Sequence, residues 1–232
     1  MGLLHDCVTA FLVKLWEGVA MNQTNYQKEL DKTITHLQAQ SRVPTLLLHA
    51  CCAPCSSYVL EYLSDYFEIT VLYYNSNISP RTEYDTRAEE LKRLISEMTF
   101  KHPVKLLVGE YEPEKFYAMA KGMEELPEGG ERCFKCYEQR LSYTAKLAKE
   151  QGFDYFTTTL SISPLKNAAK LNEIGLALEK ECGVPYLLSD FKKKNGYKRS
   201  VELSAEHNLY RQNYCGCIFS RNQAESLYRN EK

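Results

Sequence analysis

A group of cysteines placed directly after a short apolar run constrains this chain more than any other feature. Residues 45–50 (Thr-Leu-Leu-Leu-His-Ala) follow Pro44 and predict a buried strand, and Cys51, Cys52 and Cys55 come next. A helical pattern begins at Ser56. We therefore expect three thiols at the carboxyl end of a strand, where a helix starts.

The other cysteines also occur in groups. Of nine in 232 residues, seven cluster, at positions 51, 52 and 55, at 133 and 136, and at 215 and 217. A secreted disulfide scaffold is usually shorter. In a chain of this length, clustered cysteines indicate metal ligands or redox thiols in a reducing compartment, which favours the cytoplasm. Cys7 and Cys182 stand alone and are interpreted as small apolar residues.

Charge and hydropathy exclude several classes of protein. The net charge is −1, so binding to nucleic acid requires a local basic patch. No stretch approaches the ~20 apolar residues of a membrane span. Lys14 and Glu17 interrupt the apolar run that begins at Phe11. We expect neither a membrane anchor nor an export signal.

Apolar runs and helical patterns alternate along the chain. Strands are predicted over residues 45–50, 68–75, 104–108, 155–160 and 186–189. This alternation predicts an α/β fold, with a mostly parallel open sheet, helices on both faces and a helical C-terminal region. We expect one domain over residues 41–232, preceded by a peripheral helical extension over residues 1–40. Because ligands bind beyond the carboxyl ends of parallel strands, Cys51–Cys55 and Ser161–Lys166 are expected to share a site.

The chemistry of the cysteines points to a soft or borderline metal. Four thiolates suit zinc or an iron–sulfur cluster, and Cys133-x-x-Cys136 at a helix start is a suitable ligand pair. A cubane cluster takes four of the seven clustered cysteines, which leaves three for a second metal or a redox dithiol. Cys215-Gly216-Cys217 is the candidate dithiol, because a disulfide across one residue is strained and labile.

Two further interpretations of the cysteines remain open. The same residues could build a structural zinc site. Cys52-Ala53-Pro54-Cys55 after a strand is also the context of a thioredoxin-like motif, which explains neither Cys51 nor the other two pairs. His49, at the strand end, is interpreted as a hydrogen-bonded structural residue rather than a ligand.

Polar residues follow two other predicted strands. Glu83 and Tyr84 follow the second strand and are candidate proton donors, although a capped, solvated helix start is the simpler explanation. Lys166 closes a hydroxyl-rich segment after the fourth strand and is a candidate for phosphate or substrate contact. The β-propensity of threonine explains part of that segment.

Basic residues near the C-terminus are interleaved with tyrosines. Lys198, Arg199 and Arg211 lie in this region, close to Tyr210 and Tyr214. The pattern suits binding to an RNA backbone with stacking of its bases. A solvated run of lysines explains it equally well.

Taken together, these motifs resemble the QueH-type epoxyqueuosine reductases. The resemblance covers about residues 43–222. It is specific, because several long motifs occur in one order. It is carried by His49-x-Cys-Cys-Ala-Pro-Cys55, Tyr74-Asn-x-Asn-Ile-x-Pro80-x-x-Glu-Tyr84, Cys133-x-x-Cys136 with Arg140-Leu141, Thr157-Thr-Thr-Leu160 with Ser163-Pro-x-Lys166, and Lys198-Arg-Ser200 through Tyr210-Arg-Gln-x-Tyr-Cys215-Gly-Cys217.

The resemblance implies the last step of queuosine synthesis on tRNA, in which an epoxide loses its oxygen and becomes an alkene. It implies a fold similar to the nucleotide-hydrolase-like (HUP-like) group that includes tRNA thiolases. It also implies a 4Fe-4S cluster held by Cys51, Cys52, Cys133 and Cys136. Cys55 would bind an additional mononuclear iron, and an external donor would supply the electrons.

Two other functions remain as alternatives. An ATP-dependent tRNA thiolase needs a glycine-rich phosphate loop after the first strand, and residues 51–57 here read Cys-Cys-Ala-Pro-Cys-Ser-Ser, without glycine. A zinc module that binds RNA without catalysis would contain zinc and be colourless. An iron–sulfur enzyme would be brown and contain iron and sulfide.

Overall fold

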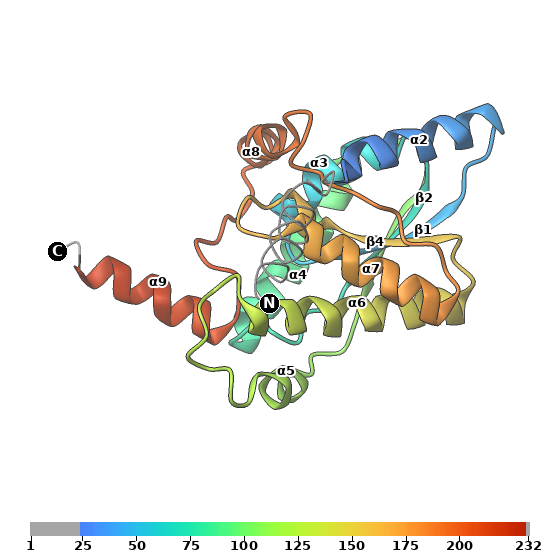
Figure 1. The fold of residues 1–232 in the computed structure, drawn as a ribbon. Coiled ribbons are helices and arrows are strands. Elements are labelled where there is room, and N and C mark those ends of the chain that lie inside the picture. Colours follow the sequence, from blue (N-terminus) through green and yellow to red (C-terminus); the bar gives the residue numbers. More distant parts are fainter. Residues whose placement is uncertain (1–23, 231–232) are drawn as a thin grey trace, which may run out of the picture.

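The computed structural model describes residues 24–230 and places one parallel sheet at their centre. In this part of the chain four strands lie in the order β3-β2-β1-β4, with helices on both faces (Figure 1). The predicted fold class is therefore confirmed. The elements are α2 (Tyr26–Ala39), β1 (Thr45–Ala50), α3 (Ala53–Leu63), β2 (Glu68–Tyr73), α4 (Arg81–Glu97), β3 (Val104–Val108), α5 (Pro113–Ala120), α6 (Glu131–Gln151), β4 (Tyr155–Thr158), the 3-10 helix η1 (Thr159–Ile162), α7 (Ala168–Cys182), α8 (Gly196–Glu206) and α9 (Ile218–Asn230).

The side chains of β1 serve two separate core layers. Leu46 and Leu48 pack in a cluster with residues of α2, α3 and α4, whereas Leu47 packs in a cluster with residues of α6 and α7. This alternation follows from the two-residue period of a strand. β1 pairs in parallel with both β2 and β4, which places His49 opposite Leu72 and Thr158. The segment after β1 therefore emerges in the middle of the carboxyl edge of the sheet.

Particular residues explain where the helices nearest this edge begin and end. Cys52 is the N-cap of α3 and has extended backbone, and Pro54 in the first turn has the φ angle that a helix requires. α6 ends at Gly152, which adopts the left-handed conformation (φ 72°) that terminates many helices. Because α6 then leads into β4, its first turn lies at the carboxyl edge of the sheet and its last turn at the opposite edge.

The segment predicted as a fifth strand over residues 186–189 does not form one. It makes only an isolated bridge, between Tyr186 and Phe156. At the end of this segment, the side chain of Asn172 accepts a hydrogen bond from the backbone N–H of Ser189 and donates one to the backbone carbonyl of Ser189. Because a side chain of α7 satisfies this backbone, it needs no strand partner.

The two ends of the described segment differ in their packing. In α2, Leu30, Ile34 and Leu37 are buried in the same cluster as β1. Residues 1–23 of the predicted N-terminal extension, including Cys7, lie outside the described residues, and the boundary at residue 40 stays a prediction. α9 extends away from the sheet (Figure 1). Among the described residues, no helix is long and apolar enough to cross a membrane.

Candidate active site

A cavity of about 490 Å³ opens beyond the carboxyl ends of β1 and β4. Cys51, Cys52 and Cys55 line it after β1, and Ser163–Lys166 line it after η1. These two segments were expected to share a site, and the structure brings them together. Residues of α8 and α9, the segment 211–215 and Glu128 also line it.

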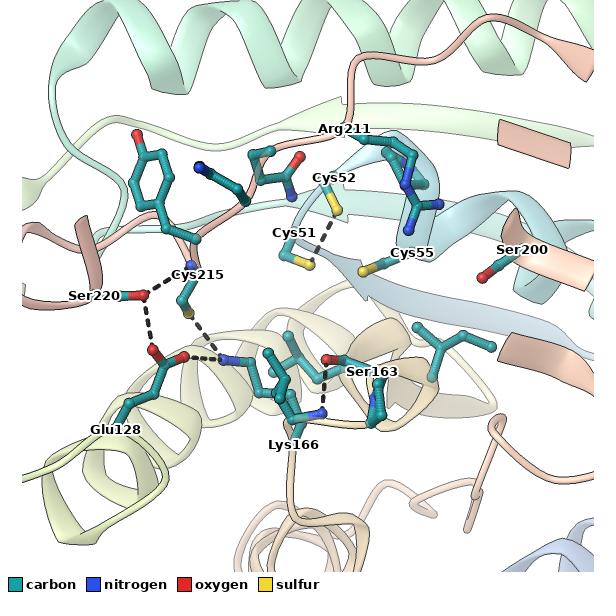
Figure 2. Close-up of a pocket in the computed structure, with 18 of the residues that line it drawn as sticks. Cys51, Cys52, Cys55, Glu128, Ser163, Lys166, Ser200, Arg211, Cys215 and Ser220 are labelled. Atoms are coloured by element: carbon teal, nitrogen blue, oxygen red, sulfur yellow. Dashed lines mark hydrogen bonds and ion pairs between the residues drawn. The ribbon is translucent and has the colours of Figure 1, made fainter. Parts of the chain in front are cut away.

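The thiols of Cys51, Cys52 and Cys55, here called the cysteine triad, converge on one point. Their three sulfur atoms all lie within 4.8 Å of one another, and those of Cys51 and Cys52 are 3.7 Å apart. The bend at Cys51, between β1 and the start of α3, brings the sulfur atoms of these adjacent residues to face each other (Figure 2). Three sulfur donors at this spacing suit a soft or borderline metal.

Hydrogen bonds within the triad separate the acidities of its thiols. Bonds from Cys51 and Cys55 hold the pKa of Cys52 well below its usual value. The bond with Cys52 raises the pKa of Cys51 to about 12, and bonds with Cys51 and Cys52 raise the pKa of Cys55 well above its usual value. The thiolate of the triad therefore resides first on Cys52, at the N-terminus of α3, where the helix dipole favours negative charge.

The remaining clustered cysteines form a second group beside the first. Cys133, Cys136, Cys215 and Cys217 line a narrow cavity of about 10 Å³. The structure thus places Cys133 and Cys136 with the Cys215/Cys217 pair. The predicted cluster ligands Cys51, Cys52, Cys133 and Cys136 come from both groups, and that set stays a prediction.

None of the eight cysteines in the described part of the chain forms a disulfide. Cys215 and Cys217, the candidate dithiol, are therefore both free thiols here, and the two differ in environment. Cys217 packs with Phe116 and Ala120, and burial raises its pKa to about 12. Burial alone would also raise the pKa of Cys215, but the charges of Lys166 and Arg140 outweigh it and lower the pKa.

A hydrogen-bonded network holds Cys215 at the cavity wall. The Lys166 ammonium donates to the Cys215 sulfur at 3.0 Å and pairs with Glu128 at 3.4 Å. Ser220 donates its hydroxyl proton to Glu128 and accepts from the backbone N–H of Cys215. Figure 2 shows the closed ring of contacts that results. The side chain of Lys166 is only 8 % exposed and lines the cavity, and its predicted contact with tRNA stays a prediction.

The Cys215-Gly216-Cys217 loop is fixed from its other side by α4. Arg87 donates to the carbonyl of Cys215 at 3.0 Å, and the N–H of Ser79 donates to the carbonyl of Gly216 at 2.9 Å. Gly216 has φ 120°, and a Cβ there would lie 2.9 Å from Nη1 of Arg87. Glycine therefore permits both the turn and the close approach of Arg87.

His49 is a structural residue, as predicted. Its Nε2 donates to the carbonyl of Tyr74 at 3.1 Å, and its Nδ1 lies 2.9 Å from the hydroxyl of Thr158. Because a carbonyl only accepts, the proton is on Nε2 and the Thr158 hydroxyl donates to Nδ1. Burial, assisted by the charge of Arg140, lowers the pKa of His49 to about 3, so the ring is neutral.

The candidate proton donors Glu83 and Tyr84 do not line the cavity. Glu83 forms an ion pair with Arg87 at 2.7 Å, within the first turns of α4. The Tyr84 hydroxyl donates to the carbonyl of Gly109 at 2.8 Å, and burial raises its pKa to about 12. Both side chains, in the first turn of α4, are therefore engaged by other parts of the protein. Their catalytic role stays a prediction.

The predicted tRNA contacts fall into different environments. Lys198 on α8 is 77 % exposed, and its nearest carboxylate, Glu202, is 4.0 Å away. Arg199 is held by Glu61 and Glu206, each at 2.7 Å. Arg211 lines the cavity and donates to the Ser204 hydroxyl at 3.0 Å. In Figure 2, Arg211 and Lys166 enter from opposite sides of the triad.

Two residues of the site carried no recognisable signal in the sequence. Glu128 lies in a loop ending in two glycines, and Ser220 lies near the start of α9. Each is brought in by the fold, so local spacing gives no indication of it.

Comparison with known proteins identifies a family that covers this site. The family model described as epoxyqueuosine reductase QueH matches residues 46–223, which include both cysteine groups. Proteins named epoxyqueuosine reductase QueH from Streptococcus pyogenes and Staphylococcus epidermidis are 44 % and 46 % identical over 198 and 200 residues. These matches cover 84 % of this chain, and 78 % and 84 % of the relatives. One from Thermotoga maritima is 36 % identical over 182 residues, 76 % of this chain and 90 % of the relative. The chain therefore belongs to the epoxyqueuosine reductase QueH family.

Proposed function

We propose that this protein reduces epoxyqueuosine to queuosine in tRNA, the last step of queuosine synthesis, in the cytoplasm. The observation that carries the proposal is the convergence of three thiols on a cavity large enough for a modified base, in a chain of this family. Deoxygenation of the epoxide gives an alkene and water and consumes two electrons and two protons. The site must therefore bind the base, exclude bulk water and receive electrons.

The residues present fit an iron–sulfur cofactor. The triad offers three sulfur donors within 4.8 Å and no carboxylate, and four more cysteines line the adjoining cavity. The charges of two buried arginines act on the triad: Arg140 acts to lower the pKa of Cys51, and Arg87 acts to lower that of Cys52. Thiolate donors beside buried positive charge suit an anionic cluster.

We assign Cys51, Cys52, Cys133 and Cys136 to a 4Fe-4S cluster and Cys55 to an additional mononuclear iron. When bound, such a cluster supplies electrons one at a time. The protein's own residues hold the substrate next to it. This ligand set, and the division of the cysteines between a cluster and a mononuclear iron, follow the family resemblance.

Cys215 and Cys217 are proposed as the dithiol that passes electrons into the site. Oxidation of two thiols to a disulfide releases two electrons and two protons, which equals the demand of the reaction. Lys166 favours the thiolate of Cys215, the form that reacts. An external electron donor would reduce the disulfide after each turnover.

The walls of the cavity suit a polar base carrying a small ring. Leu160, Ile162 and Leu165 form an apolar side, whereas Ser163 and Arg211 offer hydroxyl and guanidinium groups. The exposed ammonium of Lys198 on α8, one residue after the cavity residue Tyr197, is available for a phosphate. We propose that Lys198 and Arg211 contact the tRNA that carries the base.

Mass analysis of tRNA from cells lacking the gene tests the function. We expect epoxyqueuosine to accumulate and queuosine to return when the wild-type gene is restored. Normal queuosine in the deletion strain would contradict the proposal. Metal analysis of protein prepared without oxygen tests the cofactor separately: iron and sulfide with a brown colour support it, and zinc in a colourless protein supports a structural zinc module.

A further inference from the structure

Arg140 is a buried cation at the junction of the two cysteine groups. It lies on α6, one turn after Cys136, and only 1 % of its surface is exposed to solvent. Its Nε donates to the carbonyl of Cys136 at 3.2 Å, and its Nη1 reaches the side-chain oxygen of Asn75 at only 3.4 Å. Its Nη2 has no hydrogen-bond partner among the described residues.

No carboxylate pairs with Arg140 in the described part of the chain. Of the other buried arginines near the cysteines, Arg87 has Glu83 at 2.7 Å, whereas Arg132 donates to the backbone carbonyls of Met123 and Glu124. Burying a guanidinium without a counter-charge is costly, and a neutral partner would complete its hydrogen bonds without balancing its charge. The balancing negative charge must therefore come from another kind of group.

The candidate counter-charges are sulfur atoms. Arg140 lines the narrow cavity together with Cys133, Cys136, Cys215 and Cys217. Burial tends to lower its pKa, and Cys136, Cys215 and Cys51 reverse that effect. The guanidinium is thus electrostatically linked to both cysteine groups. A thiolate-bound cluster is an anion whose charge would balance this guanidinium.

We propose that Arg140 is a positioning residue whose buried charge is balanced by the iron–sulfur centre and raises the reduction potential of that centre. This inference rests on the proposed cofactor. Reduction adds a negative charge to the cluster, and a nearby guanidinium in a medium of low dielectric constant stabilises the reduced form. The protein thereby makes the centre easier to reduce without contributing a ligand.

Three variants separate this role from a merely structural one. Arg140→Gln removes the charge. Asn75→Asp keeps Arg140 but places a carboxylate against it. The negative charge of the carboxylate then balances the charge of the guanidinium, although the guanidinium itself is still present. Arg140→Lys keeps the charge but loses the planar group. Arg93→Gln on α4 is the control, because Arg93 is 38 % exposed and pairs with Glu90 and Glu97.

The measurement is a redox titration of the full-length protein, loaded with iron and sulfide without oxygen and followed by absorbance and electron paramagnetic resonance. Circular dichroism and iron content check each variant. We expect Arg140→Gln and Asn75→Asp to lower the ratio of reduced to oxidised cluster at least tenfold at a fixed potential, about 59 mV for one electron. Arg140→Lys and Arg93→Gln should change it by less than about threefold, which is under 30 mV on the same scale.

Several results would overturn the proposal. A folded, iron-loaded Arg140→Gln with the wild-type potential would do so, as would a tenfold shift in Arg140→Lys. If Arg140→Gln does not fold, an unchanged potential in Asn75→Asp or a tenfold shift in Arg140→Lys still contradicts it. A wild-type protein that binds no iron–sulfur cluster would overturn the proposed cofactor and this inference together, whereas equal potentials overturn only the inference.

Discussion

The ammonium of Lys166 lies 3.0 Å from the sulfur of Cys215, inside a wall that leaves its side chain only 8 % exposed. An ammonium so placed stabilises a thiolate more than a thiol. Burial would lower the pKa of Lys166 itself, but Cys215, Tyr137 and Glu128 together raise it, so the lysine stays charged. The pair is the clearest sign that one cysteine of the C-terminal group is prepared to react.

Replacing Lys166 by Met should make Cys215 less reactive. Because the folded protein holds the pKa of Cys215 below its usual value and alkylation requires the thiolate, loss of Lys166 moves the midpoint of the rate profile to higher pH. At pH 7 the rate should fall about tenfold for each unit by which the pKa rises. The test is iodoacetamide labelling of reduced, metal-free protein from pH 6 to 10, with the labelled cysteine identified by mass spectrometry.

Lys170→Met is the matched control for this prediction. Lys170 lies in the first turn of α7 and pairs with Glu173 at 2.7 Å, away from Cys215. Its loss should leave the profile of Cys215 unchanged. Identical profiles for wild type and Lys166→Met would show that the contact does not control the thiol.

Replacing Gly216 by Ala should destabilise the protein. The residue has φ 120°, and an added Cβ would lie 2.9 Å from Nη1 of Arg87 and 3.0 Å from Ile78. We expect the free energy of unfolding to fall by about 1–3 kcal/mol, from backbone strain and from displacement of Arg87. Urea denaturation followed by circular dichroism measures it.

Gly129→Ala separates the two causes. Gly129 also has positive φ (85°), but nothing lies within 4 Å of its added Cβ. Its substitution should therefore cost strain alone, about 1 kcal/mol. If Gly216→Ala costs no more than Gly129→Ala, the close approach of Arg87 contributes nothing to stability.

The sheet could be predicted from sequence because its strands are short, apolar and separated by helical patterns. The segment over residues 186–189 was wrongly predicted as a strand, because the competing partner, the side chain of Asn172, lies 14 residues before it in a helix. Apolar runs report burial. They do not report which group satisfies the backbone.

The cysteines of the site were visible in the sequence, but their grouping was not. Cys133 and Cys136 are next to Cys215 and Cys217 because α5, α6 and the start of α9 meet there, a contact across about 80 residues. Arg140 lies on the buried face of α6, one turn from Cys136 and from Thr144, but the sequence does not show what balances its charge there. Its burial against a distant strand end appears only in the fold.

Replacing Cys52 by Ser should abolish iron binding by the folded protein. Cys52 carries the lowest pKa of the triad, so it supplies the thiolate that a metal requires. Cys182→Ser is the control, because Cys182 ends α7 and belongs to neither cysteine group. Iron and sulfide analysis after anaerobic reconstitution measures the effect. Full iron content in Cys52→Ser would remove the triad from the proposed centre.

Lys198 and Arg199 are adjacent in the sequence but should differ in their effect on tRNA. The ammonium of Lys198 is 77 % exposed and 4.0 Å from its nearest carboxylate, so a phosphate can reach it. The guanidinium of Arg199 is occupied by Glu61 and Glu206. Lys198→Gln should weaken tRNA binding and lower the slope of log affinity against log salt by about 1.

Arg199→Gln is the internal control and should leave tRNA affinity and the salt slope unchanged. It should instead lower the free energy of unfolding by about 1 kcal/mol, because it removes the ion pair between α8 and Glu61 of α3. Filter binding of tRNA from 50 to 200 mM salt and urea denaturation measure the two effects. If Arg199→Gln weakens binding as much as Lys198→Gln, the ion pairs of Arg199 open on tRNA binding. The basic side of α8 would then contact the RNA as one surface.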